Sequence, residues 1–155
     1  MRERIQGAMK DAMKSGDKRR VSTLRLVTAA IKDRDIAARV DEKGHPTGKD
    51  RVEDSDILAL LQKMIKQRRE SVEIYTQGGR QELAEQEAAE IAIIEEFLPQ
   101  QMGEDEIRAA AKAVVSALGA TGLKDMGRVM AALKEKYTGQ MDFSKASAMV
   151  KEALK

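Results

Sequence analysis

Apolar residues recur every three or four positions along most of the chain, a spacing that is typical of amphipathic α-helices. The composition favours the same structure, because residues with high helix propensity are abundant and only two prolines occur in 155 residues. Aromatic residues make up 3% of the sequence, so the core must be built from aliphatic side chains and the nine methionines. The sequence therefore predicts an all-α protein.

Glycine and proline positions divide this pattern into helices. Four are predicted in an N-terminal domain, residues 1–99: over about 2–14, over about 18–40, from a cap at Asp54 or Ser55 to Gly78, and over about 80–98. Residues 41–52 contain two glycines and a proline and predict a mobile surface loop. Pro99 disfavours a helical Leu98 and marks the predicted boundary. Residues 100–155 then form a small domain of three helices, over about 104–118, 124–137 and 142–154.

The apolar spacing also predicts which side chains face inward. On the second helix the buried stripe is Leu24, Val27 and Ile31, widened by Leu26 and Ala30. The other predicted inward residues are Ile5, Ala8, Met9 and Ala12; Ile57, Leu58, Leu61, Met64, Ile65, Val72 and Tyr75; Leu83, Ile91, Ile94, Phe97 and Leu98; Ile107, Ala111, Val114 and Leu118; Met126, Val129, Met130 and Leu133; and Phe143, Ala146, Met149, Val150 and Leu154.

Several kinds of site are disfavoured by the residues present. Without cysteine there is no disulfide, thiolate metal site or cysteine nucleophile. His45 is the only histidine and lies between Gly44 and Pro46 in the predicted loop, so we expect an exposed, uninvolved side chain. Gly78-Gly79 lacks the spacing of a phosphate-binding loop. We expect no catalytic residues, no metal and no cofactor.

Glutamates concentrate in residues 78–102, which hold six of them and a single basic residue, Arg80. Carboxylate metal sites in helical bundles pair such glutamates with a histidine one turn away, and no Glu-x-x-His occurs here. A solvated helix face is the favoured interpretation. The second interpretation is that this acidic face meets the basic second helix.

Basic residues concentrate at the start of the chain, where residues 1–40 hold 11 lysines and arginines against 5 aspartates and glutamates. Cations such as these neutralise phosphates in nucleic-acid complexes, and they also occur on ordinary solvated helices. The segment Lys63-Met-Ile-Lys66-Gln-Arg68-Arg69 gives a similar but weaker signal. The predicted nucleic-acid contacts are Lys18, Arg19, Arg20 and Arg25 on the second helix, with Lys124, Arg128, Lys134, Lys136 and Lys145 in the last domain.

Several stretches resemble the YqeY family: Leu24–Lys32, Lys66–Tyr75, Gly79–Glu85, and Glu90–Pro99 with its EEFLP sequence. Others resemble the tail domain of GatB, a subunit of the glutamine-dependent amidotransferase that corrects mischarged Glu-tRNA and Asp-tRNA: Lys124–Met130 with its DMGRVM sequence, Gly139–Lys145 and Val150–Leu154. The resemblance implies a helical N-terminal domain joined to a small helical tail. In GatB-like proteins that tail approaches the body of the tRNA and carries no catalytic group.

The resemblance implies a tRNA-interacting accessory module that is not catalytic by itself, because the sequence contains nothing that matches the large catalytic domain of GatB. One alternative is a helical module that docks on an amidotransferase or an aminoacyl-tRNA synthetase. Another is a contribution to carbon–nitrogen ligase activity with glutamine as amido donor. No apolar run follows Met1 or approaches the length of a membrane span, so we expect a cytosolic protein.

Overall fold

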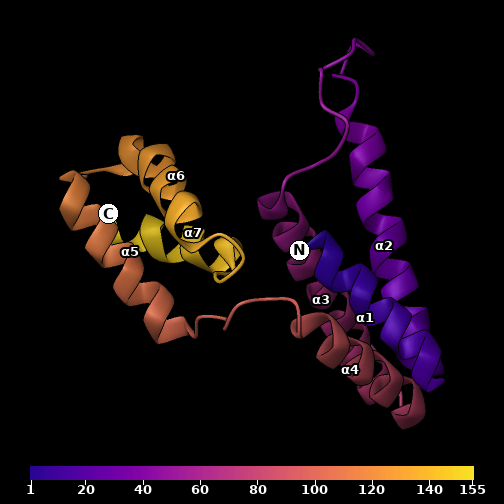
Figure 1. Ribbon diagram of the computed structural model, residues 1–155. Helices are drawn as coiled ribbons and strands as arrows, with labels where there is room; N and C mark the ends of the chain where they lie inside the picture. Colours follow the sequence, from indigo (N-terminus) through magenta and orange to yellow (C-terminus); the bar gives the residue numbers. More distant parts are fainter. The chain divides into compact units, whose positions relative to one another are not determined.

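A computed structural model describes all residues from 1 to 155 and contains seven α-helices, one short 3₁₀-helix and no strand (Figure 1). The prediction of an all-α protein is confirmed. The chain forms two compact units, Met1–Leu98 and Pro99–Lys155. Whether each unit folds as an independent domain stays a prediction. No helix is both long enough and apolar enough to span a membrane.

The first unit contains α1 (Arg2–Ser15), α2 (Lys18–Ala38), α3 (Asp54–Gln77) and α4 (Gln81–Glu95). The second contains α5 (Glu104–Leu118), the 3₁₀-helix η1 (Leu123–Asp125), α6 (Met126–Tyr137) and α7 (Phe143–Ala153). Helix α4 ends three residues earlier than predicted. Residues 96–98 continue it as a tight turn, in which the Phe97 and Leu98 N–H groups bond to carbonyls three residues back.

Helices α1 and α2 form an antiparallel hairpin with a two-residue connection. Gly16 ends α1 at a φ of 75°, a left-handed conformation that glycine adopts without strain. Asp17 caps α2, since its side chain accepts a hydrogen bond of 3.1 Å from the Arg20 N–H. At the open end of the hairpin, Arg2 on α1 is paired with Asp35 on α2.

Helices α3 and α4 form a second antiparallel hairpin, joined through Gly78 and Gly79, and α2 packs against both of them. Helix α3 begins at Asp54, and its N-cap residue, Glu53, lies one residue before the predicted cap at Asp54 or Ser55. The shared core consists of aliphatic side chains and a single aromatic, Phe97, with the Arg4 guanidinium 5.6 Å above its ring. Its buried members are Ile5, Leu24, Val27, Ile31, Ile57, Leu60, Leu61, Met64, Ile65, Ile91, Ile94 and Phe97.

One predicted core residue of α2 lies outside this core. Leu26 is 49% exposed, whereas Leu24, Val27 and Ile31 are buried as predicted. Successive helical residues are about 100° apart, so Leu26 points away from the side that α2 buries against α3 and α4. A hydrophobic residue next to a buried stripe therefore need not widen that stripe.

The second unit packs α5, α6 and α7 around its own core. Val129, Leu133, Ala146 and Val150 are fully buried there, as the apolar spacing predicts. Met141 is also fully buried, although it lies in the turn before α7 and no helical periodicity marks it. The segment before α5 is held to this unit because the Met102 N–H donates to the Gln140 carbonyl at 2.8 Å.

Candidate nucleic-acid interface

A hydrogen-bonded network fixes the chain where the 41–52 loop enters α3. Arg2 donates two bonds of 2.7 Å to the Asp35 carboxylate and one of 2.8 Å to the Val52 carbonyl. Asp35 in turn accepts the Val52 N–H at 2.8 Å. The hydrogen bonds from Arg2 are the main cause that lowers the pKa of Asp35 to about 2, and the Val52 N–H acts in the same direction. The network therefore positions the loop residues just before Val52.

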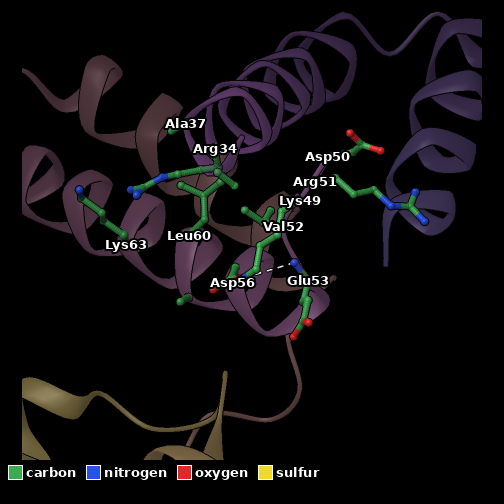
Figure 2. A pocket seen from close by; sticks show the side chains of 12 residues that line it. Arg34, Ala37, Lys49, Asp50, Arg51, Val52, Glu53, Asp56, Leu60 and Lys63 are labelled. Carbon is green, nitrogen blue, oxygen red and sulfur yellow. Dashed lines mark hydrogen bonds between the residues drawn. The ribbon is translucent and has the colours of Figure 1, made fainter. Parts of the chain in front are cut away.

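Those loop residues form one wall of a hollow of about 810 Å³, the α2–α3 groove, whose other walls are the last turns of α2 and the first turns of α3 (Figure 2). Leu60 is a buried member of the apolar core and the partly buried Val52 packs against that core, so this end of the groove is anchored to the packed interior. The lining residues are Arg34, Ala37, Ala38, Lys49, Asp50, Arg51, Val52, Glu53, Asp56, Ala59, Leu60 and Lys63.

Four cationic side chains from three segments line this groove: Arg34, Lys49, Arg51 and Lys63. None of the four forms a side-chain hydrogen bond or an ion pair. In Figure 2, Arg34 and Lys63 extend on the side away from Asp50 and Arg51. The groove therefore presents four cations that form no ion pair, beside three lining carboxylates, Asp50, Glu53 and Asp56.

The carboxylates of the groove lie mainly at the start of α3. Asp56 accepts the Glu53 N–H at 3.2 Å, the contact drawn in Figure 2. Negative side chains are favourable there because the first turn of a helix carries a partial positive charge. Glu53 and Asp56 thus serve the helix terminus. Arg34 lines the groove from the last turns of α2, and Lys63 lines it from the third turn of α3.

The predicted basic patch of α2 does not act as one cluster. Arg20 is paired with Glu96, at the end of the α3–α4 hairpin, and is only partly exposed. Lys18 and Arg25 line a second hollow, between α1 and α2, and Arg19 is exposed. Lys18 lies 16 positions before Arg34, or about 24 Å along the helix axis, so this patch and the groove are separate surfaces.

The acidic face of α4 meets basic residues, but chiefly those of α3. The Arg68 side chain donates to Glu90 at 3.0 Å, and Arg69 donates to Glu95 at 2.9 Å. The prediction of a solvated face is correct for Glu82 and Glu85, which are exposed. It is wrong for Glu90, which is partly buried against Arg68, whereas Glu95 is exposed although it pairs with Arg69. The predicted contact between the acidic face and α2 consists of one ion pair, between Arg20 and Glu96.

The tail residues fall into two groups. Arg128 is 3.3 Å from Asp125 and donates to the Leu118 carbonyl, and Lys145 is 3.4 Å from Glu104, so both have partners within the unit. Lys124, Lys134 and Lys136 are exposed and form no ion pair within 4 Å, although Lys124 interacts electrostatically with Asp125. The Lys136 ammonium lies 5.5 Å from the centroid of the Tyr137 ring. Of the predicted tail contacts, Lys134 and Lys136, in the last turn of α6, are the ones without an acidic partner.

Sequence reasoning missed the groove. Lys63 lay in a segment noted as weakly basic, but Lys49 and Arg51 belong to a loop without periodicity, and Arg34 carried no separate signal. The four residues are up to 29 positions apart in the chain. Only the fold brings them together, and no local pattern could have identified them.

No group of three or more histidines, aspartates and glutamates is placed to bind a metal. His45 is exposed as predicted, with 71% of its side chain accessible, and its Nδ1 atom lies 3.6 Å from an Asp41 carboxylate oxygen.

Comparison with known proteins gives the family. A family model described as YqeY, Yqey-like protein, matches residues 2–154. The chain belongs to the YqeY family. This match carries no separate support for the resemblance to GatB, which stays a prediction.

Three fungal proteins are similar to this YqeY family member. A Pyrenophora tritici-repentis protein named "Altered inheritance of mitochondria protein 41, mitochondrial" is 29% identical over 137 residues, which cover 84% of this chain and 70% of that protein. An uncharacterized Schizosaccharomyces pombe protein is 31% identical over 96 residues, 62% of this chain and 70% of its own. A Lachancea thermotolerans protein with the same name as the first is 34% identical over 92 residues, 59% of this chain and 44% of its own.

The expected cytosolic location is contradicted by these relatives, since two of them are named as mitochondrial proteins. The expectation rested on the lack of an apolar run after Met1. That observation bears on secretory signals and membrane spans, whereas mitochondrial transit peptides are amphipathic and rich in arginine. Two of the three relatives thus carry names that place them in mitochondria.

Proposed function

We propose that this chain is an accessory module that binds tRNA through the phosphate backbone and performs no catalysis by itself. One observation carries the proposal: four cations of the α2–α3 groove have no acidic partner, although the same unit pairs Arg2, Arg20, Arg68 and Arg69 with carboxylates. Unpaired arginine and lysine side chains on one surface are what neutralisation of phosphates requires.

The groove suits a folded RNA backbone better than single bases. No aromatic side chain lines it, so stacking of unpaired bases has no platform. Contacts from Arg34 and Lys63 on helices, with Lys49 and Arg51 on the loop, would reach phosphates from two sides. The unpaired tail lysines, Lys124, Lys134 and Lys136, would supply a second contact of the same kind. The choice of tRNA among folded RNAs rests on the resemblance of the tail to GatB.

Binding to total tRNA, measured by filter retention at several salt concentrations, tests the proposal. Each phosphate contact contributes roughly 0.7 to 0.9 to the slope of log affinity against log salt. The variant Arg34→Gln/Lys63→Gln should therefore lower that slope by about 1.5. The variant Arg34→Glu/Lys63→Glu should weaken binding by about tenfold or more, because repulsion replaces two attractive contacts.

The matched control is Lys10→Glu/Arg80→Glu, which changes net charge by the same amount at two exposed positions outside the groove. It should lower the affinity much less than the groove variant. An equal loss of tRNA affinity in the two variants would mean that the groove contributes only through the overall charge of the surface and is not a specific binding site. Absence of binding by the unaltered chain at low salt would refute the proposed function.

A further inference from the structure

The hollow between α1 and α2 has a different character from the α2–α3 groove. It has a volume of about 540 Å³, and its walls combine Met13, Val21 and Leu26 with the cations Lys18 and Arg25. Met13 is 52% exposed and Leu26 is 49% exposed, while the neighbouring Ala12 is buried. The two side chains line the same hollow beside two cations, and exposed apolar surface with a polar rim is a feature of interaction sites.

We propose that this α1–α2 hollow binds an amphipathic helix of a partner protein, one whose apolar stripe is flanked by carboxylates. The apolar walls would receive the stripe, as in other grooves that bind helices. Methionine suits this role because its unbranched side chain adapts to the shape of its partner. The inference is independent of RNA binding, because the two surfaces share no residue and lie toward opposite ends of α2.

The charged residues of the hollow indicate an acidic ligand. Lys18 and Arg25 line the hollow, no carboxylate does, and neither cation has an ion pair within the chain. The two residues are seven positions apart, so they share a side of α2 at a separation of about 10.5 Å along its axis. A helix lying along α2 presents carboxylates at the same spacing when they too are seven residues apart. An acidic helix therefore matches both cations at once.

Other occupants fit less well. An RNA backbone offers little apolar surface to cover Met13 and Leu26, and the hollow has no aromatic side chain on which a base could stack. A second copy of this chain would have to present a carboxylate-flanked apolar stripe. The acidic helix α4 buries Ile91 and Ile94 in its own unit and so offers no such stripe.

The test uses a fluorescent synthetic peptide with leucines at helical positions i, i+3, i+4 and i+7 and glutamates beside them, titrated with the full chain. A second peptide keeps the leucines and carries lysine in place of glutamate. We expect the glutamate peptide to bind about tenfold more tightly, a difference of about 1.4 kcal/mol. Equal affinity of the two peptides would overturn the proposal.

Variants of the chain locate the site. Leu26→Ser should weaken binding of the glutamate peptide about tenfold, and Arg25→Glu should remove the preference for glutamate over lysine. Leu26 is half exposed, so its replacement should leave the unfolding temperature nearly unchanged. Ile74→Ser is the matched control, because Ile74 is 67% exposed on α3 and lies outside the hollow. An equal loss with Ile74→Ser would overturn the assignment.

Two further results would contradict the proposed occupant. Displacement of the peptide by total tRNA, abolished by Arg25→Glu, would assign the hollow to RNA. A concentration-dependent dimer in sedimentation velocity, abolished by Leu26→Ser, would assign it to a second copy. The proposal holds if neither result is seen, if the glutamate peptide binds more tightly than the lysine peptide, and if Arg25→Glu removes that difference. The ligand class of the hollow is then an acidic amphipathic helix.

Discussion

Helix α3 carries basic residues toward two neighbours, and the two surfaces differ in how their charge is satisfied. Toward α4, Arg68 and Arg69 are paired with Glu90 and Glu95. Toward α2 and the 41–52 loop, Lys63 joins Arg34 without an acidic partner. In the sequence Lys63 and Arg68 belong to one basic segment. The element that a basic residue of this helix faces therefore decides its role. Residues that face α4 stabilise the fold through ion pairs, and Lys63, which faces α2 and the loop, is available to bind a ligand.

The network around Asp35 should show the largest effect on stability, because it combines a charge pair with a bond to the loop backbone. Asp35→Ala removes both bonds from Arg2 and leaves the Val52 N–H without its acceptor. We expect a loss of about 3 kcal/mol in the free energy of unfolding, measured by urea titration. A loss below about 1 kcal/mol would mean that the Arg2–Asp35 pair contributes no more than an ordinary surface ion pair.

Acid should weaken the same network. The pKa of Asp35 is about 2 in the folded chain and 3.8 in the reference state, so its contribution is complete above about pH 4 and disappears as the pH falls through 2. The contribution amounts to about 2 kcal/mol. The variant Asp35→Asn isolates it from the other carboxylates. The difference in unfolding free energy between the unaltered chain and Asp35→Asn should shrink as the pH falls from 5 toward 2, and a constant difference would contradict the assignment.

Arg68 should contribute to stability and not to RNA binding. Its side chain is mostly buried and donates both to Glu90 and to the Met64 carbonyl. We expect Arg68→Ala to cost about 1 to 2 kcal/mol of unfolding free energy, with unchanged affinity for tRNA. Arg69→Ala is the control for exposure: its more exposed pair with Glu95 should be worth less than about 1 kcal/mol.

The smallest effect on stability is expected in the groove. Arg34→Ala and Lys63→Ala remove no hydrogen bond or ion pair, so each should change the unfolding free energy by less than about 0.5 kcal/mol. Each should nevertheless reduce tRNA affinity and the salt slope. A groove variant that loses stability and keeps its affinity for tRNA would contradict the assignment of this surface to binding.

The sequence by itself determined the all-α class, the number of helices and most of the buried positions. These follow from local periodicity, because burial of one side of a helix repeats every three to four residues. The sequence did not determine that the Leu26 side chain is half exposed or that the Met141 side chain is buried. Leu26 lies beside a buried stripe but faces α1, and Met141 is buried from a turn, so in both cases the packing of neighbouring elements decided exposure.

The charged residues show where local pattern stops being informative. The sequence identified basic and acidic segments, but only the tertiary structure decided that Arg20, Arg68 and Arg69 are paired and that Arg34, Lys49, Arg51 and Lys63 are not. The physical reason is that charge interactions act through space, between side chains that the fold brings within about 4 Å. Residues 34, 49, 51 and 63 become neighbours only when α2, the loop and α3 are folded together.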